Sequence, residues 1–110
     1  MAEEVSPFRL AKDIGAQIAQ LVANIDVDSL PREQRELLML LKNQATDVRL
    51  DIRDYGMAET SEQQTRLAKE AADRLKNIQV TIVKVSEYNL LGAADTAQLS
   101  AMAEQLIATL

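Results

Sequence analysis

Cysteine and histidine are both absent from this sequence of 110 residues, and glycine, proline and aromatic residues are scarce. These absences exclude disulfides, cysteine nucleophiles, imidazole acid–base catalysis and zinc sites built on sulfur or imidazole. With three glycines in the chain, no glycine-rich phosphate loop can be traced. Aspartate, glutamate, lysine, serine and tyrosine could still support catalysis, but they form no recognisable set. We therefore expect a protein that is not an enzyme and carries no metal or cofactor.

Long apolar runs are absent as well. The longest run, Leu37–Leu41, has five residues, whereas a membrane-spanning helix needs about 20. Residues 1–7 lack the basic and apolar regions of a secretory signal. The 17 acidic and 12 basic residues give a net charge of −5, which disfavours attraction to nucleic acid or anionic lipid. These features predict a soluble, cytoplasmic protein that binds neither nucleic acid nor membrane.

Apolar residues recur every three or four positions along most of the chain, which is the spacing of amphipathic helices. Glycine, proline and polar breaks divide this pattern into four helices, at about residues 7–25, 31–55, 61–89 and 95–109. Because the connections are short, consecutive helices should pack antiparallel. The sequence thus predicts one all-α domain, residues 1–110, folded as an up-down four-helix bundle. The second and third helices should form a long hairpin.

Each helix has one apolar stripe that should face the core, and most helices have a recognisable end signal. The predicted stripes are Leu10, Ile14, Ile18, Leu21 and Ile25; Leu37, Leu41, Ala45, Val48, Ile52 and Tyr55; Leu67, Ala71, Leu75, Ile78, Ile82 and Val85; and Leu99, Met102, Ala103, Leu106 and Leu110. The predicted end signals are N-caps at Ser6, at Ser29, at Thr60 or Ser61 (three residues before Gln63 and Gln64), and at Asp95, a hydrophobic staple between Val5 and Leu10, and a left-handed C-cap at Gly56. Residues 78–85 alternate like a strand, but no second strand could pair with them, so we expect helix there.

The second helix separates its charges along the two edges of its apolar face. At about 100° per residue, Glu33, Glu36, Asp47, Asp51 and Asp54 follow one edge. The other edge is basic, with Arg35, Lys42, Arg49 and Arg53. Carboxylate oxygens suit Mg²⁺ or Ca²⁺, but a single helix edge supplies too few convergent ligands. We interpret the acidic edge as an ion-paired or solvated flank.

Asp28-Ser29-Leu30 resembles the attachment motif of acyl carrier proteins, which are also small acidic four-helix bundles with the modified serine at the head of the second helix. The resemblance covers three residues. The short connection before Ser29, the nearby Pro31 and the long second helix all depart from the carrier pattern. We therefore assign Ser29 to helix capping. A carrier with a phosphopantetheine site at Ser29, or a bundle that binds a small apolar molecule, is the alternative function.

Residues 30–38 resemble the opening helix of bacterial helix-turn-helix regulators of the sigma-factor region 4 kind. In those families a tight turn and a basic recognition helix follow after about a dozen residues. Here the helical pattern continues to Tyr55 without a turn, and the net charge has the wrong sign. The sequence therefore argues against a DNA reader.

The remaining interpretation is a non-catalytic interaction module, which would act as an adaptor, regulator or assembly component. Protein partners would bind the surfaces of its helices. A second copy of the chain is one candidate partner, because the first helix is almost uncharged on its outer side. Its small residues Gly15, Ala19 and Ala23 lie at fourfold spacing and would let another backbone approach closely.

Helix lengths predict where a partner site would lie. The second and third helices are longer than the first and fourth, so their turn around Gly56 should project beyond the four-helix core. Arg53, Tyr55 and Met57 lie at this tip, and these residue types are enriched at protein interfaces. We predict that they form a partner-binding site.

Overall fold

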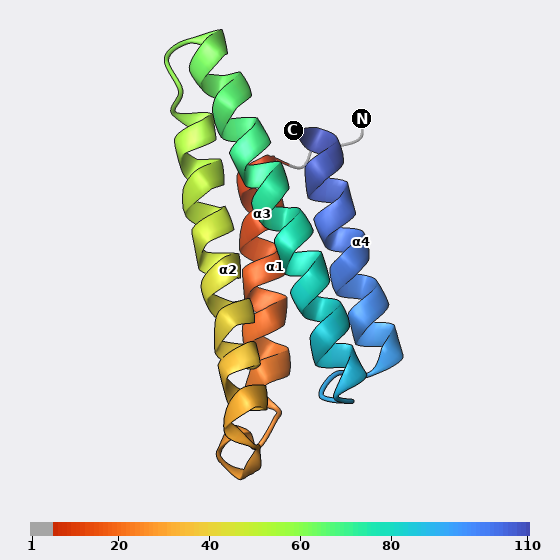
Figure 1. Ribbon diagram of the computed structural model, residues 1–110. Coiled ribbons are helices and arrows are strands. Elements are labelled where there is room, and N and C mark those ends of the chain that lie inside the picture. Colours follow the sequence, from red (N-terminus) through yellow and green to blue (C-terminus); the bar gives the residue numbers. More distant parts are fainter. Residues whose placement is uncertain (1–5) are drawn as a thin grey trace.

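The computed structural model describes residues 6–110 and contains four helices within that range. They are α1 (Pro7–Ala23), α2 (Arg32–Gly56), α3 (Ser61–Glu87) and α4 (Ala93–Thr109), and one 3-10 turn, η1 (Val27–Ser29), precedes α2. Consecutive helices run antiparallel, and α1 also packs against α4, which closes the bundle (Figure 1). The predicted all-α four-helix bundle is confirmed. Among the described helices none is long and apolar enough to cross a bilayer.

Two of the predicted N-caps are present. The Ser6 hydroxyl accepts a hydrogen bond from the backbone N–H of Arg9 at 3.2 Å, and Pro7 occupies the first helical position of α1. The Thr60 hydroxyl accepts from the N–H of Gln63 at 3.1 Å, so α3 begins where its sequence predicts. The predicted staple involves Val5, which lies outside the described residues.

The other two predicted N-caps are wrong. Pro31 takes the cap position of α2 in an extended conformation, and Ser29 instead donates its hydroxyl hydrogen to the Asp26 carbonyl at 2.7 Å. Gly92 takes the cap position of α4, which leaves Asp95 inside the first turn without a capping bond. In both places an extended backbone at proline or glycine sets the helix start, so no side-chain cap forms.

The helix C-termini also differ from expectation. Gly56 is the last residue of α2 and has no left-handed backbone. The left-handed residue is Asn89, with φ 59°. The Asn89 N–H bonds the Ser86 carbonyl at 2.9 Å, and the Leu90 N–H bonds the Val85 carbonyl at 3.3 Å. This pair of bonds is a Schellman motif, which ends α3 at Glu87 rather than at residue 89.

The core follows the predicted stripes with shifts of one residue. Val22 and Leu38 are buried in place of Leu21 and Leu37, which are half-buried together with Tyr55. The buried apolar residues are Leu10, Ala11, Ile14, Ile18 and Val22 of α1; Leu38, Leu41, Ala45, Val48 and Ile52 of α2; Ala71, Leu75, Ile78, Ile82 and Val85 of α3; and Leu91, Leu99, Ala103 and Leu106. Residues 78–85 are helical, as expected.

The hairpin of α2 and α3 projects beyond the other two helices (Figure 1). Toward this tip the last buried side chains are Ile52 of α2 and Ala71 of α3. No residue between them in the chain is fully buried, although Leu67 and Ala68 are half-buried. Two helices packed only against each other cannot bury side chains as fully as four helices do. This explains why the part of the hairpin beyond Ile52 and Ala71 has few apolar residues facing inward.

Leu41→Ala and Ile82→Ala should each lower the free energy of unfolding by about 2–5 kcal/mol, because each deletes a fully buried side chain and leaves a cavity. These two side chains are 1% and 0% exposed. Urea unfolding followed by circular dichroism measures the change. Val80→Ala is the control, since Val80 is 54% exposed and should change stability by less than about 0.5 kcal/mol. A neutral result at Leu41 or Ile82 would contradict the packing described above.

Candidate functional site

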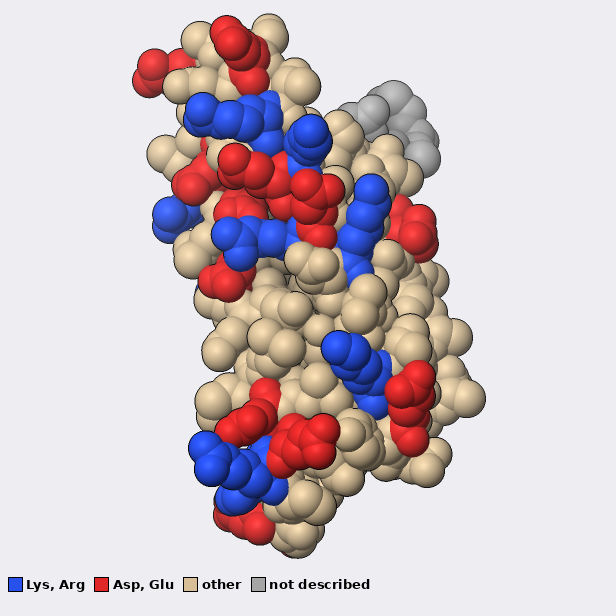
Figure 2. All heavy atoms as spheres, viewed as in Figure 1, with Lys and Arg blue, Asp and Glu red and all other residues tan. Residues whose placement is uncertain are grey.

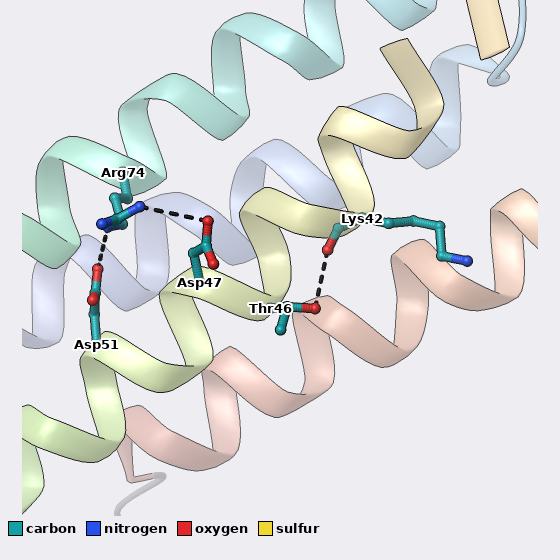
Figure 3. Close-up of polar contacts among 5 residues, drawn as sticks. All are labelled: Lys42, Thr46, Asp47, Asp51 and Arg74. Atoms are coloured by element: carbon teal, nitrogen blue, oxygen red, sulfur yellow. Dashed lines mark hydrogen bonds and ion pairs between the residues drawn. The ribbon is translucent and has the colours of Figure 1, made fainter. Parts of the chain in front are cut away.

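The two flanks of α2 carry opposite charges and face different neighbours. On the acidic flank, Arg74 of α3 reaches across to α2 (Figure 3). Its Nε lies 2.5 Å from Asp51 Oδ2, and its second nitrogen lies 3.6 Å from Asp47 Oδ2. Asp54 pairs with Arg53 at 3.6 Å. The acidic edge is therefore an ion-paired flank, and the described residues include no cluster of three or more groups placed to hold a metal.

Asp51 is the most enclosed of these carboxylates, with 18% of its side chain exposed. Burial raises the pKa of Asp51 above its ordinary value, and the negative charges of Glu70, Asp47 and Asp54 add to the effect. Arg74 opposes this rise. Because the pKa is higher in the folded chain, the protonated form favours folding and ionisation of Asp51 works against it.

This shift predicts how Asp51→Asn changes stability with pH. The favourable contribution of protonated Asp51 is present below its ordinary pKa of 3.8 and is lost as pH rises through the higher folded value. The stability of the variant relative to the parent protein should therefore increase as the pH rises above 3.8 and passes through the folded pKa of Asp51. Urea unfolding at a series of pH values measures this difference. A stability difference that stays constant, or falls as pH rises, would show that burial does not raise the pKa of Asp51.

The basic flank of α2 borders a groove against α1. One hollow of about 250 Å³ is lined by Gly15, Ile18 and Ala19 of α1 and by Lys42, Asn43, Ala45, Thr46 and Arg49 of α2. A second hollow of about 300 Å³ is lined by Val22, Val27, Arg35, Leu38, Met39, Lys42 and Asn43. Lys42 and Asn43 line both hollows, so the two adjoin each other along α2, and together we call them the α1–α2 groove. Figure 3 shows Lys42 on the side of α2 away from Arg74.

The cations of the α1–α2 groove are unpaired within the part of the chain that the structure describes. Arg35, Lys42 and Arg49 follow one another at intervals of seven residues along α2, and none takes part in an ion pair there. The α1 wall is neutral, because no charged residue occurs between Asp13 and Asp26. The groove therefore has a positive wall, a neutral wall and a largely apolar lining.

Exposed apolar side chains extend this surface. Met39, which lines the groove, is 64% exposed. Phe8 is 43% exposed and precedes Gly15 by seven residues, which places both on the same side of α1. Large apolar side chains in water are unfavourable unless they contact something. Met39 therefore adds exposed apolar surface to the groove, and Phe8 adds exposed apolar surface on the side of α1 that carries Gly15.

Gly15 has no role in packing the bundle. A Cβ atom at this position would meet no neighbouring atom within 4 Å, and the backbone of Gly15 is not left-handed. Glycine in the middle of a helix is nevertheless less favourable than alanine by roughly 0.5–1 kcal/mol. The isolated fold therefore gives no reason for a glycine at this position in the groove.

Gly15→Ala should raise the free energy of unfolding by roughly 0.5–1 kcal/mol, because alanine loses less backbone entropy and meets open space. Chemical unfolding at constant pH and salt measures the gain. Ala19→Gly, one helical turn away on the same wall, should lower stability by a similar amount. A loss of stability in Gly15→Ala would show that the groove is narrower than described.

The face made by α2, α3 and α4 has a different character. Its charged residues gather near the hairpin tip and near the opposite end, and an uncharged band lies between them (Figure 2). Leu40 of α2 and Val80 and Val83 of α3 are about half exposed. The two valines therefore face outward and do not join the buried stripe of α3. Lys69, Lys76 and Lys84 follow one another along α3 at intervals of seven and eight residues, and Lys76 and Lys84 lie on the side of α3 that carries Val80.

The structure places Arg53, Tyr55 and Met57 near the hairpin tip but does not gather them on one face. Arg53 and Tyr55 are two residues apart, which is about 200° around a helix. Tyr55 is half-buried, while Met57 is 72% exposed. Ser29, the other predicted site residue, is exposed in η1, and its hydroxyl is held by the bond to the Asp26 carbonyl.

Comparison with protein-family models, with curated proteins and with solved structures found nothing that matches this chain. Sequence reasoning had identified the basic edge of α2 and the uncharged stretch of α1 as separate features. It did not bring them together as the two walls of one groove. The sorting of charges on α2 was the signal that could have predicted the groove. The acidic flank of α2 needs a neighbour with a cation, which is α3 with Arg74, and the basic flank is then left to face α1.

Proposed function

We propose that this protein is a non-catalytic helical interaction module that binds a protein partner in the α1–α2 groove. The observation that carries the proposal is the unpaired row of Arg35, Lys42 and Arg49 above an apolar lining. Most cations of the chain, including Arg9, Lys12, Arg66, Lys69, Lys76 and Lys84, have no ion pair within residues 6–110. What sets these three apart is that they line one groove whose other wall is uncharged and whose floor is largely apolar. A binding partner would supply both the missing charges and the cover for the apolar surface.

The dimensions of the groove favour a polypeptide over a small molecule. Its two hollows, of about 250 and 300 Å³, lie one after the other along α2 rather than forming a single rounded pocket. Together they follow α2 from Arg35 to Arg49, which is about 21 Å at 1.5 Å per residue. Such a shallow, elongated depression matches the shape of a bound helix or peptide.

The alternative function, a carrier modified at Ser29, has no structural observation in its favour. The Ser29 hydroxyl is exposed but donates to a backbone carbonyl at 2.7 Å, as expected for a turn residue. The intact mass of the protein purified from its native host distinguishes the two functions. A phosphopantetheine adduct on Ser29 would favour the carrier.

Site-specific photo-crosslinking in the native host tests where the partner binds. A photoreactive side chain at Asn43, in the groove, should crosslink to a protein of defined mass. The same side chain at Ala101, an exposed position on α4, should not. The crosslink should disappear when Lys42→Glu and Arg49→Glu are added, while thermal unfolding stays nearly unchanged, because exposed charges contribute little to stability.

A third crosslinking position, Met57, tests the predicted site at the hairpin tip. If crosslinks form at Met57 and not at Asn43, the partner binds the tip and the groove assignment is wrong. Tyr55→Ala with Met57→Ala should then abolish the interaction without unfolding the bundle. Crosslinks at none of these positions would contradict an interaction module.

A further inference from the structure

We infer that the partner segment bound in the α1–α2 groove is an acidic amphipathic helix about four turns long. This inference rests on the proposed function and adds the chemistry of the partner. It follows from the length of the groove, the spacing of its cations and the lack of a matching acidic surface on the chain itself.

The shape of the groove suits a helix. Its two walls are antiparallel helices, and its lining contains small or apolar side chains of α1 and α2. An amphipathic helix can lay its apolar face along such a depression, which is a common mode of peptide recognition. The absent side chain at Gly15, together with Ala19 one turn away, leaves room for large apolar residues of the partner.

The charges define the polar edge of that helix. Arg35, Lys42 and Arg49 repeat every seven residues, which is about 10.5 Å along a helix axis. A helix lying beside α2 would match them with carboxylates at intervals of seven residues. The opposite wall is uncharged from residue 14 to residue 25, so the other edge of the partner needs no charge.

A second copy of this chain is a poor source of such a helix. The exposed carboxylates Glu36, Asp47 and Asp54 of α2 already pair within the chain, with Arg32, Arg74 and Arg53 respectively. On α3, the acidic residues form no ion pair among the described residues, but no two of them are seven residues apart; they are Glu62, Glu70, Asp73 and Glu87. On α4 the acidic residues are Asp95 and Glu104 alone, and Glu104 accepts a hydrogen bond from Gln79 at 3.0 Å. A nucleic acid would meet the same cations, but its phosphates would leave the apolar lining unused.

Titration of the ¹⁵N-labelled protein with synthetic peptides tests the inference. The probe is an amphipathic peptide of about 20 residues, long enough to form helix in water, with three glutamates at intervals of seven along one edge of its apolar face. The matched control peptide carries lysine at the three glutamate positions. We expect the acidic peptide to shift amide signals of residues 15–22 and 35–49, with an affinity that falls as salt rises. The lysine peptide should bind at least roughly tenfold more weakly.

Two groups of variants localise the binding. Lys42→Glu with Arg49→Glu should weaken binding of the acidic peptide by roughly tenfold or more. Lys69→Glu with Lys76→Glu makes the same change in net charge at exposed positions of α3 and should leave the affinity within about twofold of the parent value. Gly15→Leu should abolish binding by filling the groove, while circular dichroism shows an unchanged helical fold.

Several outcomes would overturn the inference. The first three concern the peptides: the acidic and lysine peptides bind equally well, the amide signal changes are confined to α3 and α4, or the acidic peptide does not bind even at millimolar concentration. The other two concern different occupants: a single-stranded oligonucleotide binds more tightly than the acidic peptide, or the protein forms a concentration-dependent dimer through the groove. If Asn43 crosslinks to a partner but the peptides do not discriminate, the groove is a docking site and only the charge assignment is wrong. If the acidic peptide binds selectively but no crosslink forms in cells, the proposed function is wrong and the groove's preference for acidic helices remains.

Discussion

The apolar seam between α2 and α3 is the contact on which the rest of the bundle depends. These are the two longest helices, and each contributes five fully buried apolar side chains, from Leu38 to Ile52 and from Ala71 to Val85. The shorter helices α1 and α4 cover only the part of the seam away from the tip. Where they end, no side chain of the hairpin is fully buried, because two helices cannot exclude water as four do. The position of the projecting tip is therefore a consequence of how far the neighbours extend.

Electrostatics and packing together decide which flank of α2 has its charges paired within the bundle and which flank does not. Arg74 of α3 holds Asp47 and Asp51 on one flank of α2, and this leaves the cations of the opposite flank beside the uncharged α1. Partly exposed ion pairs such as these contribute little to stability. Their larger effect is on the distribution of charge, since they offset part of the negative charge of the acidic flank, while the opposite flank keeps its positive charge.

If the α1–α2 groove binds a partner as proposed, the needs of folding and of binding differ there. The bundle would gain from a longer side chain at Gly15 and from fewer exposed apolar groups at Phe8 and Met39. Each of these features costs stability in the isolated protein. A helical partner in the groove would cover the apolar groups and use the open space, so the same residues would become favourable in the complex.

The amino-acid sequence by itself determined the helices, their order and most of the core, because helical periodicity is a local property that each segment expresses alone. The caps at Ser6 and Thr60 were predictable for the same reason, since each depends on a contact three residues along the chain. The ends at Ser29, Gly56 and Asn89 were not, because several turn conformations competed there and the path to the next helix selected one of them. Only the tertiary structure decided that the basic edge of α2 would lie beside α1 and the acidic edge beside Arg74. That choice depends on which side of a helix each neighbour packs against, and residues distant in the sequence meet only after the whole bundle has closed.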